Sequence, residues 1–394
     1  MSKAKFLSIR LQTSTKQILT VSKAILKKQI SRYPAFLEDF EQRFARYTDK
    51  QYGLSFCNGT SAIEASMFAA NIGEGDEVIV PSCTFHASID PILNLGATPV
   101  FADVDQSFTI CPVDIAKKIT PRTKAIVVVH LFGIPANMGS ILEVIKGRNI
   151  TLIEDASHAH GARWGDRLCG GIGDFGAFSL QGSKTVAGGE GGIVVTNDFS
   201  DYIRMSMWGH FNRHAELFSK IDADEFYFTG VGYKRRMHPI SALLADADLD
   251  HLESVNQIKR KYASILDREL AEIKGIEVAK PSPEAVRGSF YQGYPIRVTR
   301  ENVSAEQAIT ALKSVGIAAI PYPFALHHKL PVYTDKVFRQ ALIRQQPVEN
   351  VTPSPFLLPV TENLKEQLLL LSPKYLISLD KKSLKQLKNT LKSL

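Results

Sequence analysis

Lys184 stands among small residues in the stretch FSLQGSKTVAGGEGGIVVTN, which has glycine at positions 182, 188, 189, 191 and 192. A lysine held away from water without an ion-pair partner has a lowered pKa, because burial disfavours its charged form. Its neutral amine is a nucleophile that forms a Schiff base with a carbonyl compound. A lysine that faces solvent or pairs with Glu190 fits the same stretch, so Lys184 alone leaves the chemistry open.

A second candidate group lies in CNGTSAIEA, where Gly59, Thr60 and Ser61 stand at the predicted start of a helix over 61–73. Ser61 and Glu64 have the spacing of a capping box. A glycine before a helix leaves backbone N–H groups open at the positive end of the helix dipole, which favours phosphate. Simple capping explains the same residues without a ligand, and both interpretations stay open.

Asp155 ends a predicted strand in ITLIEDASHAHGA, and His158 and His160 follow it closely. A carboxylate at this place binds a metal, pairs with a cationic heterocycle or caps a helix. The sequence has no clear third ligand near the two histidines, and its four cysteines show no CxxC pair. We therefore predict no metal site and no disulfide framework, and the cysteine usage favours a reducing, cytoplasmic setting.

These groups together match the needs of pyridoxal 5'-phosphate (PLP). The cofactor requires an amine for its aldehyde, an anion site for its phosphate, a carboxylate for its ring nitrogen and an aromatic side chain over the ring. Lys184, Gly59 with Thr60, Asp155 and Phe85 supply one part each. We therefore predict a PLP site that depends on all four groups lying at one edge of one sheet.

Short apolar runs alternate with helical patterns between about residues 50 and 200. The predicted strands are 77–81, 98–105, 125–133, 150–156 and 191–197. The predicted helices between them are 61–73 and 138–149. Runs of Val and Ile on consecutive positions are typical of strands buried on both faces, and this alternation predicts an α/β domain with a mostly parallel central sheet.

Polar residues follow several of these runs, namely Ser82, Asp103, His130, Glu154 and Asp155. Ligands of open α/β sheets bind beyond the carboxyl ends of the strands. We therefore expect these residues to share one cleft. Each of them taken singly is explained as well by a cap or a turn.

The pattern changes after about residue 235. A long helix is predicted over 238–273, a strand over 294–302 and a helix over 304–316 with a glycine stop. Leu384, Leu387, Leu391 and Leu394 have the spacing of a docked terminal helix. We predict a basic N-terminal arm or helix (1–35), a large domain (36–250) and a smaller C-terminal α+β domain (251–394).

Composition narrows the class of protein. The 394 residues are 44% hydrophobic and 22% charged, as in ordinary globular proteins, and no run has the apolar length of a membrane span. The net charge of +7 is concentrated at the ends, and residues 1–37 hold no acidic residue. No nucleic-acid recognition motif accompanies this charge, so we predict neither a nucleic-acid nor a membrane partner.

The spelling GxGxxG occurs at Gly171–Gly176. A dinucleotide fingerprint requires a strand before it and a helix after it. Here the polar RWGDRLCG precedes it and the strand-like AFSL follows, so we interpret it as a glycine-rich turn.

The order of the motifs resembles the DegT/StrS-type sugar aminotransferases. The resemblance is carried by NGTSAIEASMFAANIGEGDEVIVPSCTFHAS, LGATPVFADVD, HLFGIPANM, IEDASHAHGA, GDFGAFSLQGSKTVAGGEGGIVVTN and GYKRRMHPISALLADADLDHL. It runs from about residue 36 to 255 and continues loosely to IPYPFALHHKLPVY at 320–333. It implies a PLP enzyme of fold type I, the aspartate-aminotransferase fold.

The resemblance also implies roles for single residues. Lys184 would form the Schiff base with PLP, Asp155 would pair with the ring nitrogen, and Phe85 would stack on the ring. His158 would lie beside the phenolic oxygen. Gly59, Thr60 and Ser179 would hold the phosphate.

The family completes each active site with the partner subunit, which implies a homodimer. In this chain GYKRRM (232–237) replaces the family's Gly-Tyr-Asn-Tyr-Arg-Met, so Lys234 stands where the family has a neutral phosphate ligand from the partner. Lys234 either keeps that role as a point charge, binds substrate or points to solvent. We expect Arg236 and His327 to bind substrate.

The implied activity is the transfer of an amino group from glutamate or glutamine to a nucleotide-linked keto-sugar, in amino-sugar biosynthesis. One alternative is a keto-cyclitol of the inosose type. Another is a catalytically silent regulator or scaffold, against which the retained Lys184 and Asp155 stand. Relatives that catalyse PLP-dependent dehydration have histidine in place of the lysine, so Lys184 disfavours that reaction.

Overall fold

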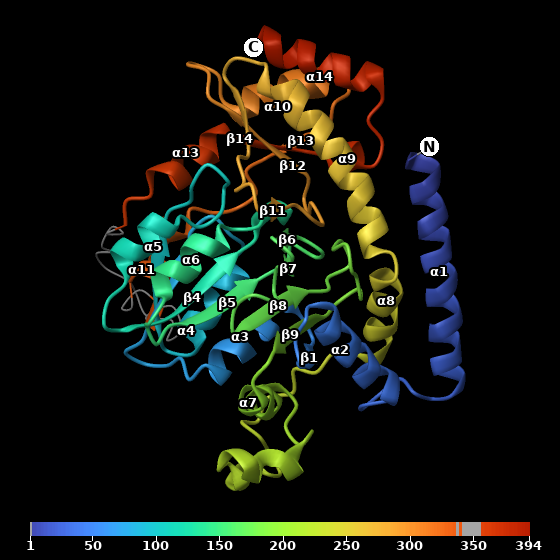
Figure 1. Cartoon of the computed structure of the whole chain (residues 1–394), viewed down its shortest axis with the longest axis vertical. Coiled ribbons are helices and arrows are strands. Elements are labelled where there is room, and N and C mark those ends of the chain that lie inside the picture. The colour runs from blue at the N-terminus through green and yellow to red at the C-terminus, as the bar shows by residue number, and fades with distance from the viewer. Residues whose placement is uncertain (1, 336–338, 341–355) are drawn as a thin grey trace.

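A computed structural model describes residues 2–335, 339–340 and 356–394. Its main feature is a seven-stranded sheet with the strand order β1-β9-β8-β5-β4-β2-β3 (Figure 1). The strands are β1 (Tyr52–Phe56), β2 (Glu77–Pro81), β3 (Thr98–Ala102), β4 (Thr123–Val129), β5 (Thr151–Asp155), β8 (Phe175–Ser179) and β9 (Gly192–Thr196). β9 runs antiparallel to both of its neighbours, and the other pairs are parallel. The expected mostly parallel sheet is confirmed.

Helices cover both faces of this sheet because its strands are apolar on consecutive positions. Val78, Val80 and Val127 face one side, where they pack with α3 (Gly59–Ala69), α4 (Asp90–Asn94) and α7 (Phe199–Gly209). Ile79 and Val128 face the other side. That side is covered by α5 (Pro112–Lys118) and α6 (Met138–Ile145), and further along by α2 (Ala35–Tyr47) and α8 (Pro239–Leu249). Neighbouring residues therefore serve two cores, as strands buried on both faces require.

The predicted elements are present, with shifted ends. The strand predicted over 98–105 ends at Ala102, and the one predicted over 125–133 ends at Val129, before a single 3-10 turn at Leu131–Gly133. The predicted capping box at the start of α3 is wrong. Asn58 caps this helix by accepting a hydrogen bond from the backbone N–H of Ser61 at 2.8 Å, and the helix begins two residues before the predicted start.

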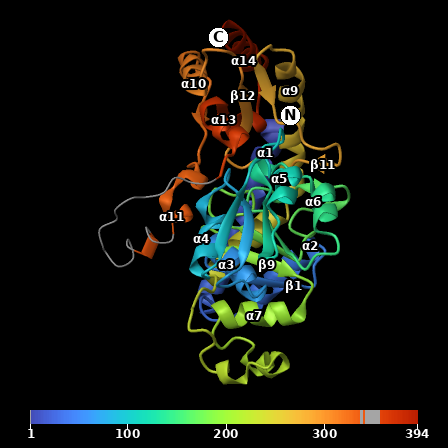
Figure 2. The ribbon, with the colours of Figure 1, turned by 90° about the vertical axis from the view of Figure 1, so that its left-hand side faces the viewer.

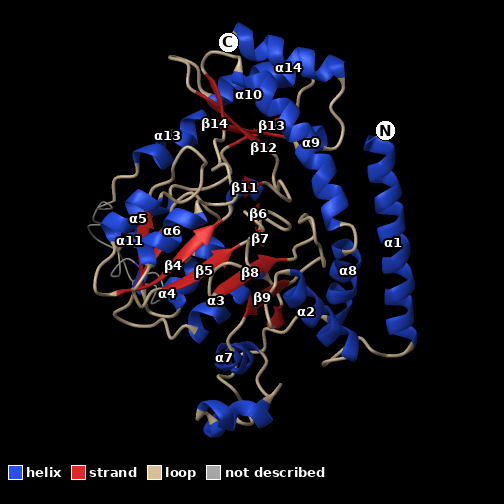
Figure 3. Cartoon of the chain, viewed as in Figure 1, coloured by secondary structure: helices blue, strands red, loops and turns tan. Residues whose placement is uncertain are grey.

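A second, smaller sheet lies toward the C-terminal end of the chain, as Figure 3 shows in red. Its antiparallel order is β10-β12-β14-β13. The strands are β10 (Ile276–Val278), β12 (Tyr294–Val298), β13 (Ala319–Pro321) and β14 (Leu368–Leu371). The helices that share its core are α9 (Leu252–Ala271), α10 (Ala305–Ser314) and α14 (Lys381–Ser393). Leu387 and Leu391 are buried in this core, as the leucine spacing of α14 predicted.

The helix predicted over 238–273 is two helices, α8 and α9, because the chain leaves helical geometry at His251 (φ −116°, ψ 3°). The remaining elements are short. They are β6 (Arg163–Trp164), which pairs with both β7 (Arg167–Leu168) and β11 (Ala285–Val286), and the helices α11 (Pro331–Thr334) and α13 (Pro359–Gln367). The division into 1–35, 36–250 and 251–394 stays a prediction, and its boundary at 250 falls between α8 and α9.

The basic N-terminus forms the long helix α1 (Ser2–Leu26), which lies along α8 (Figure 1). Lys16 and, from α2, Arg43 each form ion pairs with Asp246 and Asp250 of this region. A segment after α7 projects from the end of the molecule that lies away from the C-terminus, at the bottom of Figures 1 and 2. Among the described residues, no helix combines the length and the hydropathy that a membrane span requires.

Candidate active site

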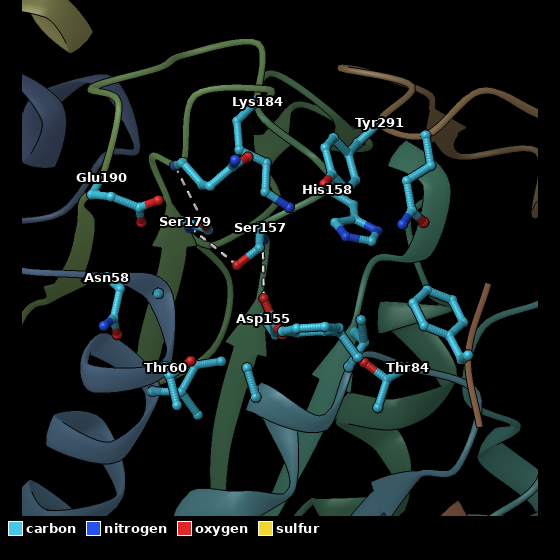
Figure 4. A pocket seen from close by; sticks show the side chains of 18 residues that line it. Asn58, Thr60, Thr84, Asp155, Ser157, His158, Ser179, Lys184, Glu190 and Tyr291 are labelled. Carbon is cyan, nitrogen blue, oxygen red and sulfur yellow. Dashed lines mark hydrogen bonds between the residues drawn. The ribbon is translucent and has the colours of Figure 1, made fainter. Parts of the chain in front are cut away.

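A cavity of about 420 Å³ lies at the carboxyl ends of the parallel strands. Its wall is built by the N-terminus of α3, the segment after β2, the end of β5, the turn after β8 and a loop before β12 (Figure 4). Segments far apart in the sequence meet here because parallel strands present their carboxyl ends at one edge. The predicted residues that line it are Gly59, Thr60, Phe85, Asp155, His158, Ser179 and Lys184.

Lys184 lies in the tight turn that follows β8. Its backbone N–H donates to the carbonyl of Gln181 at 2.8 Å. Its Nζ lies 3.5 Å from the centre of the Tyr291 ring. Burial lowers the pKa of Lys184 from 10.5 to about 7, and the nearby Asp155 opposes this shift. A large fraction of the amine is therefore neutral and nucleophilic near neutral pH.

Asp155 is the last residue of β5 and is 6% exposed. Its carboxylate accepts hydrogen bonds from the Ser88 hydroxyl at 2.7 Å and from the backbone N–H of Ser157 at 3.1 Å. These donors fix the orientation of the carboxylate toward the cavity that it lines. A fixed buried carboxylate at this place suits a cationic heterocyclic nitrogen.

His158 is buried beside Lys184, and its ring centre lies 4.4 Å from that of Tyr291. Burial, with the charges of Lys184 and His160, lowers the pKa of His158 well below its ordinary value. Its Nδ1 is buried and makes no hydrogen bond within the described part of the chain. A neutral imidazole with a buried, unpartnered nitrogen on the cavity wall is suited to hydrogen-bonding a bound group.

The N-terminus of α3 and the end of β8 form the candidate anion site. The first backbone N–H groups of a helix have no intrahelical acceptor and attract phosphate. Gly59 allows a close approach, because a Cβ at this position would lie 2.8 Å from the Cβ of Ser179. The backbone N–H of Ser179 donates to the Ser157 hydroxyl at 3.0 Å. Thr60 and Ser179 both line the same cavity.

Phe85 lines the cavity at its rim and is 51% exposed. Its ring centre lies 4.0 Å from that of His86, at an interplanar angle of 41°. An aromatic ring that is exposed at the rim of a cavity is available to pack against a flat ligand.

Three predicted residues do not line this cavity. Lys234 is exposed, and its backbone bridges that of His210. Arg236 lies over the Tyr33 ring at 5.4 Å. His327 is buried, with its Nδ1 3.0 Å from the backbone carbonyl oxygen of Ser82. The role of Lys234 in binding the cofactor and the roles of Arg236 and His327 in binding substrate stay predictions.

The expectation of one shared cleft is wrong for Ser82, Asp103, His130 and Glu154, none of which lines the cavity. The Ser82 hydroxyl bonds Nδ1 of His328 at 2.8 Å, and Asp103 accepts from the backbone N–H groups at 360 and 361. His130 is buried against Glu154, with Nε2 and Oε2 2.9 Å apart. Of the five polar residues predicted for the cleft, Asp155 lines the cavity, while the other four bind neighbouring segments of the structure.

The glycine-rich turn at 170–173 surrounds a carboxylate. Glu154 accepts from the backbone N–H groups of Gly170, Ile172 and Gly173 as well as from His130. His130 and Cys169 lie with Glu154 in the arrangement of three metal ligands. The four donors already occupy both oxygens of Glu154, so we assign this cluster a structural role. The turn holds the carboxylate of Glu154, which agrees with the interpretation of Gly171–Gly176 as a glycine-rich turn and not as a dinucleotide motif.

Several residues of the wall were missed from the sequence, among them Thr84, Ser157, Gln181, Tyr291 and Gln292. Ser157 stands two residues after Asp155 in the same motif, so its position near the cavity could have been predicted. Tyr291 lies in GSFYQG, where two glycines frame an aromatic residue just before a strand. The flanking glycines indicate a loop with unusual backbone angles. The contact of this loop with the turn of Lys184 depends on the tertiary fold, so the sequence does not show it.

The comparisons with known proteins agree with this geometry. The chain is 34% identical over 308 residues to GDP-perosamine synthase of Escherichia coli O157:H7, covering 78% of this chain and 81% of that one. A putative L-glutamine:3-amino-2,3-dideoxy-scyllo-inosose aminotransferase of Micromonospora echinospora is 29% identical, with 83% and 78% covered.

A solved structure of 3-amino-5-hydroxybenzoic acid synthase superposes with a TM-score of 0.82 at 25% identity, covering 96% of each chain. Its similarity confirms the expected fold type I architecture of PLP-dependent transferases. The model of the DegT/DnrJ/EryC1/StrS aminotransferases matches residues 12–369. The chain therefore belongs to the DegT/DnrJ/EryC1/StrS aminotransferase family.

Proposed function

We propose that this protein is a PLP-dependent aminotransferase that moves an amino group from glutamate or glutamine to a nucleotide-linked keto-sugar. The observation that carries the proposal is the single cavity lined by the amine of Lys184, the carboxylate of Asp155 and the N-terminus of α3. The relative that makes a GDP-linked amino sugar supports the nucleotide-linked substrate.

The residues of the cavity fit this cofactor. When bound, PLP provides an aldehyde for an amine and a ring that accepts electrons from a carbon next to nitrogen. Lys184 would hold the aldehyde. Asp155 would keep the ring nitrogen protonated, since a neighbouring carboxylate favours the charged form. Gly59, Thr60 and Ser179 would hold the phosphate, Phe85 would cover the ring, and His158 would lie beside the phenolic oxygen.

Lys184 would also move the proton of the reaction. In the cofactor-free cavity its amine has a pKa of about 7. A group with a pKa near the operating pH is an efficient acid and base, because it takes up and returns a proton with similar ease. The Tyr291 ring beside Nζ limits the positions from which this amine can act.

We further propose a homodimer in which the partner subunit completes the substrate side of each cavity. In a single chain, Lys234 is exposed and does not line the cavity. The backbone of Lys234 bridges that of His210, just after α7, and its exposed side chain is available to another subunit. A cation from the partner would suit the phosphate groups of the cofactor or of a nucleotide-linked substrate.

A keto-cyclitol is the second candidate substrate. The inosose aminotransferase of Micromonospora echinospora among the relatives supports it. A cyclitol has no nucleotide, so the two candidates differ in their need for diphosphate recognition.

The test is a panel of keto-sugar nucleotides and inososes, each supplied with glutamate or glutamine and PLP, and read by product mass. The proposal predicts one aminated product, a visible absorbance band on the PLP-loaded protein and loss of both in Lys184→Arg. A protein that gains no band and aminates no compound of the panel would contradict the proposed activity. Amination of an inosose alone would replace the keto-sugar by the cyclitol.

A further inference from the structure

The loop that carries Tyr291 has an unusual backbone. Ser289, Phe290 and Gln292 have φ angles of +59°, +52° and +65°. Residues with a Cβ rarely adopt this left-handed region, and each one costs roughly 1–2 kcal/mol there. Surrounding contacts must therefore hold this loop, which places the Tyr291 ring against Lys184 and His158.

Two side chains of α9, one helical turn apart, hold the loop at Ser289. Asn256 is fully buried; its Oδ1 accepts from the backbone N–H of Ser289 at 2.7 Å and its Nδ2 donates to the carbonyl of His160 at 2.8 Å. Lys259 donates from Nζ to the carbonyl of Ser289. The buried Phe290 side chain anchors the loop in the core of the small sheet.

Lys259 also reaches the turn that carries Lys184. Its Nζ lies 3.0 Å from the hydroxyl oxygen of Thr185, the residue after Lys184. The Thr185 hydroxyl lies 2.9 Å from that of Ser289, and the Ser183 hydroxyl donates to Tyr291 at 3.3 Å. One ammonium group therefore joins the turn of Lys184 to the loop of Tyr291.

The partners of Lys259 are neutral oxygens, and no ion pair to Lys259 is found within the described ranges. Burial lowers its pKa from 10.5 to about 8, with no charged neighbour opposing the shift. A cation held by neutral oxygens is a poor source of folding stability, because it loses hydration without gaining a counter-ion. Its contacts are better explained by the link that they make between the turn of Lys184 and the loop of Tyr291.

We infer that Lys259 is a positioning residue, which acts through Thr185 and Ser289 to hold the amine of Lys184 against the Tyr291 ring. Its effect on turnover rests on the proposed function, whereas its effect on the surroundings of Lys184 does not. A displacement of about 1 Å at a reacting group lowers a rate by roughly 100-fold. Loss of the link would also let water reach Lys184.

The test compares four variants. Lys259→Met removes the link, Lys259→Arg keeps a cation with several donors, and Thr185→Val removes the receiving hydroxyl without changing any charge. Lys261→Met is the matched control, because Lys261 is an exposed residue of the same helix. Circular dichroism checks that each variant is folded.

The first readout uses the cofactor-free protein and needs no activity. Trinitrobenzene sulfonate labels neutral amines, and peptide mass spectrometry follows the labelling of Lys184 against pH. The half-maximal rate is expected near pH 7 in the wild type. It shifts upward by about one pH unit or more in Lys259→Met and Thr185→Val, because hydration favours the ammonium form. Lys259→Arg and Lys261→Met keep the wild-type profile.

The second readout is steady-state kinetics of the PLP-loaded protein. Lys259→Met and Thr185→Val should each lower kcat by roughly 10- to 100-fold with little change in KM for the donor. The double variant should lose no more than the worse single variant, because both substitutions break one link.

An unchanged labelling profile in folded Lys259→Met and Thr185→Val, or kinetic losses that multiply in the double variant, would overturn the inference. If the wild type transfers no amino group while Lys259→Met and Thr185→Val show the expected labelling shifts, the proposed function is contradicted and the role of Lys259 as a link is supported.

Discussion

The amine of Lys184 lies 3.5 Å from the centre of the Tyr291 ring, although the two residues come from different parts of the fold. Lys184 follows a strand of the large sheet, and Tyr291 precedes a strand of the small one. The ring excludes water from the amine on one side, and the cavity wall with Asp155 bounds it on the other. This enclosure gives a lysine a pKa of about 7 without an immediate ion-pair partner.

The pKa of Lys184 makes the stability of the cofactor-free protein depend on pH. In the unfolded chain the amine is charged up to about its ordinary value of 10.5, whereas in the fold it loses its proton near 7. The unfolded state therefore binds more protons between these values, and the cost of burying the charge falls as pH rises through this window. Lys184→Met should raise the free energy of unfolding by at least about 1 kcal/mol at pH 7 and below.

The gain from Lys184→Met should shrink steadily as the pH approaches 10. Urea unfolding of the two cofactor-free proteins at several pH values measures it. Asp155, His158 and Glu190 line the same cavity and are the same residues in both proteins. A gain that stays constant with pH would show that the amine is not buried in the way described.

Asp155→Asn should leave the fold intact and slow the reaction. The asparagine keeps the size of the side chain and the Oδ1 that accepts from the backbone N–H of Ser157. Its NH2 group replaces Oδ2, and the Ser88 hydroxyl, which donates to Oδ2 in the wild type, can turn to accept from it. The substitution removes the charge that favours a protonated ring nitrogen, and loss of one such electrostatic contact lowers kcat by roughly 100- to 1000-fold. Rapid-mixing kinetics measures the proton-transfer step. The control is Asp49→Asn at an exposed aspartate, and a near wild-type rate for Asp155→Asn would remove Asp155 from its role.

Gly59→Ala should weaken binding of the cofactor's phosphate. The new Cβ would lie 2.8 Å from that of Ser179, so α3 must move away from β8. Overpacking of this kind costs about 1–3 kcal/mol. Equilibrium dialysis with PLP measures the loss of affinity, which should exceed tenfold. Gly73→Ala is the matched control, because a Cβ at Gly73 meets no atom within 4 Å; equal effects of the two substitutions would contradict a phosphate site at α3.

Local patterns in the sequence predicted the strands and the residues that directly follow them. Consecutive Val and Ile residues marked β2, β4 and β9, and the position of Asp155 at the end of its strand placed it on the cavity wall. The same reasoning failed for Ser82, Asp103 and His130. Many polar residues at strand ends brace neighbouring segments, and only their tertiary partners distinguish a brace from a binding group.

The other residues that the sequence did not predict were missed for the same reason, because tertiary contacts decide their roles. Asn58 and Ser61 are both good capping residues, and the approach of α3 to β8 decides between them. Tyr291 and Lys259 contact the turn of Lys184 although they lie about 75 to 110 residues away in the sequence, and no short motif encodes such contacts. Lys184 was found because its glycine-rich surroundings are local in the sequence.

The most direct test of the account is to load the protein with PLP, reduce it with borohydride and map its peptides by mass spectrometry. Borohydride fixes a Schiff base as a stable amine, so the label marks the lysine that holds the cofactor. The account predicts one pyridoxyl group on Lys184 and none on Lys234 or Lys259. A label on another lysine, or no label on a protein that transfers amino groups, would contradict it.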